Sequence, residues 1–124
     1  MKTQGTNAAF FAAELRRLKI LPTGYIYDAQ LRPVRDLLRR RLLFVHQRTA
    51  LMLSFKSLYT RTTGQALALS QLKALEIQAA QALYEHPANQ LIAGMQIKQI
   101  EHLTESIEKL EKAVLASADG AQIN

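Results

Sequence analysis

The sequence contains no cysteine and no tryptophan, and it has few glycines, prolines and aromatic residues. Without cysteine the chain forms no disulfide, no thiolate zinc site and no cysteine nucleophile. The same absence fits a reducing compartment, and we expect a cytoplasmic protein. Alanine, leucine, glutamine, arginine and glutamate dominate the remaining composition, which favours helix throughout.

Long apolar segments are also missing. No run approaches the ~20 apolar residues that cross a bilayer, so we expect no membrane partner. Residues 1–17 contain too short an apolar core for a secretory signal, and charged residues follow that core directly.

Motifs of catalysis are absent as well. His46, His86 and His102 are far apart and lack the spacing of metal ligands, and no glycine-rich phosphate loop occurs. Two-metal phosphoryl chemistry needs several carboxylates around ions about 4 Å apart, and few acids lie outside the C-terminal third. We therefore expect no cofactor, no metal and no catalytic residue, and the residues favour a chain that is not an enzyme by itself.

Caps and helix breakers divide the chain into four expected helices. Asn7 is a good N-cap, Pro33 suits a first turn, Gly64 ends a helix and Ser70 caps another. The sequence predicts an all-α fold, an elongated helical hairpin or coiled coil with two long helices and two shorter ones. The expected helices span residues 8–20, about 33–62, 70–84 and about 88–116, and residues 117–124 form a flexible tail.

Charge is distributed unevenly along the chain. Residues 1–62 hold twelve basic and three acidic side chains, a balance of +9, whereas residues 63–124 hold four and seven, a balance of −3. This polarity indicates one half that faces a polyanion and another that faces a partner or solvent.

The expected helix over residues 33–62 combines an apolar stripe with a dense set of basic side chains. Leucine or phenylalanine recurs every seven residues at Leu37, Phe44, Leu51 and Leu58, and arginines project to the opposite side. Such a basic face favours binding to nucleic acid, although a merely solvated face is the alternative. The candidate nucleic-acid-binding residues are Arg32, Arg35, Arg39, Arg40, Arg41, Arg48, Lys56 and Arg61.

Arg41 and Arg48 depart from this separation, because they fall within the apolar stripe. An unpaired buried charge costs several kcal/mol, so each must be paired or must reach water. One solution is a packed helix that offers acids, for which Glu101, Glu105 and Glu108 are candidates. The other is an open seam where the guanidinium groups bind phosphates.

The expected helix over residues 88–116 has a seven-residue apolar repeat. The repeat predicts pairing with another helix, either of the same chain or of a second one, and both alternatives stay open. The candidate self-association residues are Ile100, Leu103, Ile107, Leu110 and Val114.

Two segments, AAELRRLKILPTGYIY and RPVRDLLRRRLLFVHQRTALMLSFKSLYTRTTG, resemble the middle of the DEDD transposases. These are the Piv-like, RuvC-type enzymes of insertion sequence one hundred and ten and its relatives. The resemblance covers nearly the whole chain and is most specific over residues 8–64. It implies that residues 1–31 are a remnant of the end of a nuclease domain and that 32–116 are the helical, coiled-coil region.

In that family a metal-binding nuclease domain precedes the helical region, a serine-containing domain follows it, and a structured RNA guides the oligomeric enzyme. The last acidic motif of the nuclease domain reads roughly Lys-Thr-Asp-x-x-Asp-Ala. Here Lys2 and Thr3 match, but Gln4 stands at the first aspartate, and Asn7 or Ala8 stands at the second. The resemblance therefore transfers no catalytic residue.

The resulting hypothesis is a truncated transposase fragment of DNA transposition and recombination that binds DNA or structured RNA and is inactive alone. It is expected to form homo-oligomers or to pair with an intact transposase. The alternative is a coiled-coil protein-interaction module with no role in nucleic-acid binding.

Overall fold

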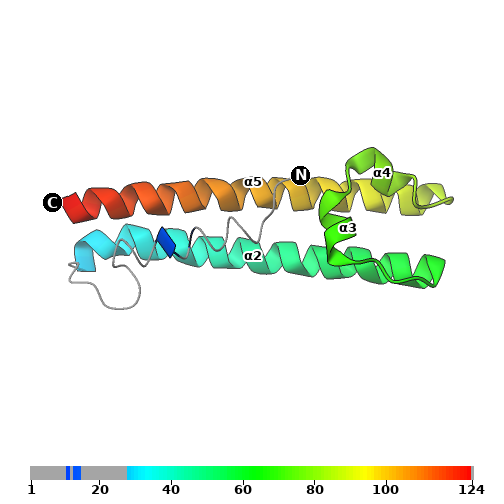
Figure 1. The fold of residues 1–124 in the computed structure, drawn as a ribbon, viewed down its shortest axis with the longest axis horizontal. Coiled ribbons are helices and arrows are strands. Elements are labelled where there is room, and N and C mark those ends of the chain that lie inside the picture. Colours follow the sequence, from blue (N-terminus) through cyan, green and yellow to red (C-terminus); the bar gives the residue numbers. More distant parts are fainter. Residues whose placement is uncertain (1–10, 12, 15–27, 124) are drawn as a thin grey trace. The chain divides into compact units, whose positions relative to one another are not determined.

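The computed structural model describes the backbone of Phe11, Ala13, Glu14 and residues 28–123, and the side chains of the first three and of residues 31–117. This part of the chain is helical and contains no strand (Figure 1). Its helices are α2 (Asp28–Thr63), α3 (Leu69–Ala74), α4 (Ile77–Gln81) and α5 (Pro87–Ile123). The prediction of an all-α fold with two long helices and two shorter ones is confirmed.

The chain divides into two compact units. One, here called the loop unit, contains residues 44–105. The other, here called the terminal unit, combines the described residues up to Leu43 with those from Ser106 onward. Each unit contains a part of α2 packed against a part of α5, so the hairpin is described unit by unit.

Two side-chain hydrogen bonds fix the direction of the helices in the loop unit. The side-chain amide of Gln96 donates to Oγ of Ser54 over 2.9 Å, and Arg48 donates to Thr104 over 3.3 Å. Residue numbers rise along α2 as they fall along α5, so the two segments are antiparallel. This is the pairing expected of a helical hairpin.

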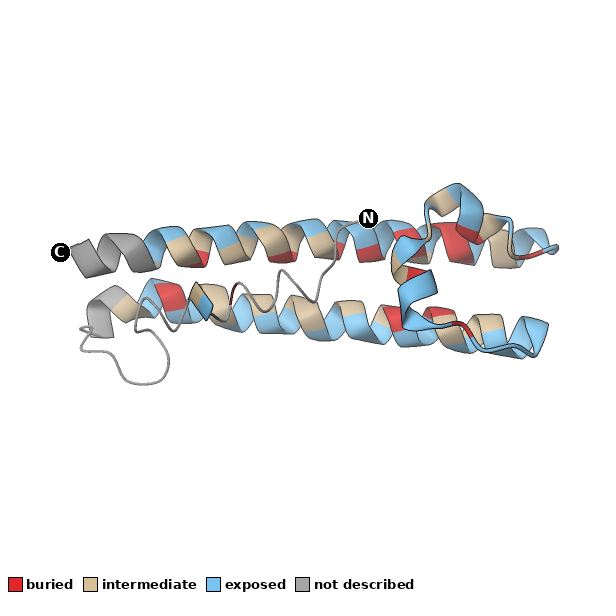
Figure 2. Cartoon of the chain, viewed as in Figure 1, coloured by how far each residue is buried: buried red, intermediate tan, exposed pale blue. Residues whose placement is uncertain are grey.

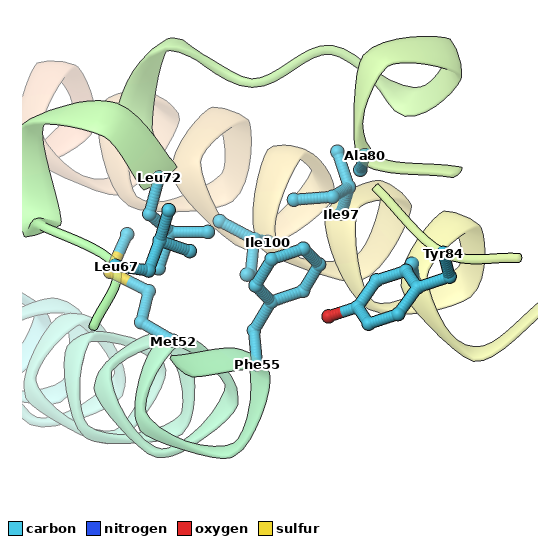
Figure 3. Close-up of a cluster of buried hydrophobic side chains, with 9 residues drawn as sticks. Met52, Phe55, Leu67, Leu72, Ala80, Tyr84, Ile97 and Ile100 are labelled. Carbon is cyan, nitrogen blue, oxygen red and sulfur yellow. The ribbon is translucent and has the colours of Figure 1, made fainter. Parts of the chain in front are cut away.

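The core of the loop unit lies where α2, α5 and the connection between them meet. Phe55 of α2 is fully buried, and its ring and that of Tyr59 meet the ring of Tyr84 edge to face, with centroids 6.5 Å apart in both pairs. Figure 3 shows side chains from α2, α3, α4 and α5 converging on this cluster. The connecting segment is thus part of the hydrophobic core and fixes the hairpin.

Helix α2 starts earlier than predicted and ends where the sequence predicted. The helix begins at Asp28 rather than at Pro33, so this proline lies inside the helix. As the sixth residue of the helix, Pro33 removes the backbone hydrogen bond to the carbonyl of residue 29, and its ring crowds that carbonyl, so the first turn of α2 is held less firmly than the rest. At the other end α2 stops at Thr63, and Gly64 follows with φ 74° and donates to the carbonyl of Thr60 over 2.8 Å. This left-handed cap confirms the predicted break at the glycine.

The expected single helix over residues 70–84 is wrong. It is divided into α3 and α4 because Leu75 and Glu76 have extended backbone, with ψ 132° and 165°. Ser70 is not the N-cap, since α3 begins one residue before it. The break lets Leu72 and Tyr84 both reach the core, so tertiary packing has overridden helix propensity.

Helix α5 begins at the predicted proline and is longer than expected. Pro87 occupies the first helical position, where its missing donor costs little. The ring Nδ1 of His86 accepts the backbone N–H of Ala88 over 3.0 Å and so caps the helix. The helix continues to Ile123, where the sequence predicted a tail after Ala116. The other expected helix, over residues 8–20, lies mostly outside the described residues.

Candidate nucleic-acid interface

The apolar stripe predicted for α2, here called the seam, and the basic face lie on different sides of the helix, as the helical periodicity requires. The seam residues Val34, Met52 and Phe55 are buried, and the intervening leucines of the seam are partly buried. Figure 2 shows this banding along both long helices. Among the candidate basic residues, the exposed ones are Arg32, Arg35, Arg39, Arg40 and Arg61.

The exposed arginines of the terminal unit lie close together on α2. Arg32, Arg35 and Arg39 are spaced by three and four residues, so they share one side of the helix over about 10 Å. Arg40 lies beside them. Between Arg32 and Arg40, Asp36 is the one acidic residue. We call Arg32, Arg35, Arg39 and Arg40 the basic strip.

Arg41 does not belong to the basic strip, because its side chain lies in the seam of the terminal unit. Its Nη2 and Nε atoms both approach Oε2 of Glu111, at 2.8 and 2.9 Å. The guanidinium also lies over the ring of Phe11, 4.5 Å from its centroid, within the range of a cation–π interaction. The side chains of Arg41 and Glu111 are 22% and 14% exposed, so the pair is largely withdrawn from solvent.

Arg48 lies in the seam of the loop unit and contacts a neutral group there. Its Nη1 donates to Oγ1 of Thr104, and that hydroxyl donates in turn to the carbonyl of Ile100 over 2.9 Å. The hydroxyl therefore donates its hydrogen bond to the backbone carbonyl and accepts one from the guanidinium. Lys56, the remaining candidate, is partly buried in the same unit.

For Arg41, the structure selects one of the two solutions left open by the sequence. It is paired with a carboxylate of α5, as the first solution required, but the partner is Glu111. Glu101, Glu105 and Glu108 were the wrong candidates. Antiparallel pairing is predictable, but the residue opposite Arg41 depends on the register, which the length and path of the connecting segment determine.

The predicted self-association residues of α5 are used within the chain. Ile100, Leu103, Ile107 and Val114 are buried, and Leu110 is partly buried. Ile100 packs into the core of the loop unit, and Val114 packs against Val34 in the terminal unit. Of the two alternatives, intramolecular packing accounts for this repeat, and the seam is not available to a second chain while the hairpin is closed.

One titratable group stands out in the loop unit. Burial raises the pKa of Tyr84 above its ordinary value, and the neighbouring Tyr59 raises it further. The hydroxyl of Tyr84 is buried without a hydrogen-bond partner among the described residues. Tyr84 packs edge to face with Phe55 and Tyr59 in the core of the loop unit, so this group is an aromatic core position.

The histidines remain apart in the structure, and all three are exposed. His86 caps α5, as described above, and His46 and His102 lie on α2 and α5. Among the described residues no three histidine, aspartate or glutamate side chains gather closely enough to hold a metal ion. Within the same residues, no helix has an apolar stretch of the length that a bilayer crossing needs.

Sequence reasoning missed Phe11, Glu111 and Thr104 as partners of the two seam arginines. Phe11 lies within the expected helix over residues 8–20, and nothing in the sequence pattern linked it to Arg41. The chain matches no protein-family model, no curated protein and no solved structure.

Proposed function

We propose that this chain binds nucleic acid through the basic strip of α2, as the helical part of a DEDD-type transposase. The observation that carries the proposal is the exposure of four arginines on about two turns of one helix. Guanidinium groups bind phosphate oxygens in a bidentate manner, and a row of them follows a phosphate backbone without reading its sequence. The family resemblance supports the same role, and we propose that the chain acts in the cytoplasm.

The geometry narrows the set of contacts that the sequence suggested. Arg41 is withdrawn and paired, and Arg48 is partly buried and contacts Thr104. The proposal therefore rests on Arg32, Arg35, Arg39 and Arg40, with Arg61 as a further exposed cation. It assigns no catalytic residue to this chain.

Salt dependence of binding tests the proposal. If all four arginines of the basic strip contact phosphates of a duplex, the logarithm of the binding constant falls with the logarithm of salt concentration with a slope of about −3.6. Fluorescence anisotropy of a labelled duplex between about 50 and 200 mM salt measures this slope. A slope near zero, or no binding at low salt, contradicts the proposal.

A matched pair of variants locates the contact. Arg39→Gln with Arg40→Gln should reduce the slope by about two units. Lys109→Gln with Lys112→Gln removes the same charge from exposed positions of α5 and should leave the slope nearly unchanged. Glutamine is a good helix former, so neither pair should disturb the helices. Equal losses from the two pairs would show that only net charge matters.

The proposal includes pairing with a second copy or with an intact transposase. Because the α5 repeat is buried within the chain, pairing between two closed hairpins uses another surface. Sedimentation of the purified chain, alone and with a duplex, measures whether the nucleic acid brings copies together. A single monomeric species in both conditions would limit the proposal to a monomeric binder.

A protein-interaction module is the second candidate function. Large apolar side chains are exposed on the loop unit, with Leu91 61% and Met95 60% exposed on one side of α5. Such a surface suits a protein partner better than phosphates. If Leu91→Gln with Met95→Gln abolishes association in sedimentation while the basic-strip variants have no effect on any binding, the interaction module is the correct function.

A further inference from the structure

One side of α5 in the loop unit is exposed and apolar over its first turns. Ala88, Leu91 and Met95 follow at intervals of three and four residues, so they share this side, and all three are exposed. Leu91 is 61% and Met95 60% exposed, whereas Ile97 projects to the opposite side and is buried in the core of the loop unit. Residues 87–97 contain no ionisable side chain, so this surface is uncharged. We call Ala88, Leu91 and Met95 the apolar patch.

A hollow lies beside the next turns of the same side. It has a volume of 320 Å³ and is lined by Met95, Lys98, Gln99 and His102. These four residues are exposed, so the hollow opens to solvent. The thioether of Met95 and the hydrocarbon stems of Lys98 and Gln99 give it apolar walls. The hollow therefore suits an apolar side chain and has room for a leucine.

Because the apolar patch and the hollow follow one another along one helix, the surface is complementary to itself. When two copies of α5 meet antiparallel with Met95 at a two-fold axis, residues at equal distances before and after Met95 face each other. Leu91 of each copy then lies opposite Gln99 of the other copy, at the hollow, and the small Ala88 lies opposite His102. Each copy inserts one leucine and receives one, which is the isologous contact that closes a dimer.

The charges favour this arrangement over others. Antiparallel pairing about Met95 separates the two Lys98 side chains by six residues, or about 9 Å along the axis, whereas a parallel pair would place them side by side. A nucleic acid would meet a single lysine here, against four arginines in the basic strip. An acidic protein would find no cation over residues 87–97. A second copy, in contrast, presents a matching apolar surface.

We propose that two copies of the chain pair through the apolar patch and the hollow of antiparallel α5 helices. This inference rests on the proposed function, which includes pairing with a second copy, and it names the surface for that pairing. The contact runs from Ala88 to His102, about 21 Å along the helix. Such a short interface predicts a dimer that exchanges rapidly with monomer at micromolar concentration.

Sedimentation of the full chain over a range of concentrations is the first test. Leu91→Gln with Met95→Gln should weaken the dimer at least about a hundredfold, because four apolar side chains per dimer return to water. The control is Leu53→Gln with Leu69→Gln, which removes two leucines that are 59% and 45% exposed elsewhere on the loop unit and should leave the dissociation constant unchanged. Equal weakening by both pairs would show unspecific apolar association and overturn the inference. A chain that stays monomeric at every concentration would overturn it as well.

Disulfide cross-linking tests the orientation, because the chain has no cysteine of its own. Met95→Cys lies at the two-fold axis and should give a disulfide-linked dimer. Leu91→Cys alone should not, since its two copies are about 12 Å apart along the axis and a disulfide needs Cα atoms about 4.4–6.8 Å apart. Leu91→Cys chains mixed with Gln99→Cys chains should link to each other. Efficient linkage of Leu91→Cys to itself would indicate a parallel pair and refute the proposed contact.

Nucleic-acid binding is measured separately on the same variants. Arg39→Gln with Arg40→Gln should weaken binding to a duplex and leave the dimer unchanged. A dimer without salt-dependent binding would support this inference and overturn the proposed nucleic-acid contact, whereas a monomer that binds with the expected slope would do the reverse. If the chain never dimerises and Leu91→Gln with Met95→Gln weakens duplex binding, the apolar patch contacts nucleic acid and pairing through it is refuted.

Discussion

The ion pair between Arg41 and Glu111 should contribute little net stability, and replacing both residues tests this. The pair lies in an apolar seam with Arg41 22% and Glu111 14% exposed, so both groups have lost most of their hydration. Replacing a buried pair by well-packed apolar side chains is often neutral or stabilising by about 1–4 kcal/mol. We expect Arg41→Met with Glu111→Leu to unfold within about 1 kcal/mol of the unmodified chain, or at higher stability.

The single variants should behave differently from the double variant. Arg41→Met leaves Glu111 in the seam without its cation, and Glu111→Leu leaves Arg41 without its carboxylate. Full burial would make each cost about 3–5 kcal/mol, and the residual exposure of both groups reduces this to about 1–3 kcal/mol. For a chain of this length, each kcal/mol shifts the melting temperature by about 3–6 °C.

Urea unfolding followed by circular dichroism measures the free energy of unfolding of the unmodified chain, the two single variants and the double variant. The expected pattern is two destabilised single variants and a double variant close to the starting chain. If the double variant loses as much as the two single variants together, the two side chains do not interact in solution. If it is less stable than either single variant, the ion pair stabilises the fold and the desolvation argument is refuted.

Three other variants test the loop unit by urea unfolding. Tyr84→Phe removes a buried hydroxyl without a partner and should be neutral or stabilising by up to about 1 kcal/mol. Because folding raises the pKa of Tyr84, the unfolded chain loses the hydroxyl proton at a lower pH than the folded chain, and the free energy of unfolding falls above about pH 10. Tyr84→Phe should reduce that fall. An unchanged pH profile would contradict the raised pKa of Tyr84. Gly64→Ala should cost about 1 kcal/mol through its φ of 74° alone, since nothing lies within 4 Å of the added carbon, and a neutral result would refute the left-handed cap. Gly94→Ala places the new Cβ 2.7 Å from the side-chain amide nitrogen of Gln81, which is too close. It should therefore stabilise the chain only together with Gln81→Ala, by up to about 1 kcal/mol from helix propensity. A gain from Gly94→Ala alone would show that the Gln81 side chain moves freely.

The periodic features of the long helices could be predicted from the sequence. The seven-residue repeats around Phe55 and Ile107 identify the buried sides of α2 and α5, because helix geometry alone relates spacing to side. The end of α2 at Gly64 was predictable for the same local reason, since glycine adopts a positive φ at low cost. These predictions needed no knowledge of which segments meet.

The features that depend on tertiary contacts could not be predicted. The break at Leu75 and Glu76 exists because Leu72 and Tyr84 must reach one core, and no local signal marks it. The choice of Glu111 for Arg41 depends on the antiparallel register. Phe11 lies far from Arg41 in the sequence, so the contact between the two follows from the fold and from no pattern of residues.

The seam that α5 fills against α2 has a consequence for refolding at high concentration. Every contact that closes the hairpin, including the one between Arg41 and Glu111, forms equally well when α5 is exchanged between two molecules. Refolding from urea at high concentration should therefore yield a swapped dimer that reverts slowly, because exchange back requires the seam to open. The ratio of monomer to dimer would then record the history of the sample, and the binding experiments should begin from chains refolded at high dilution.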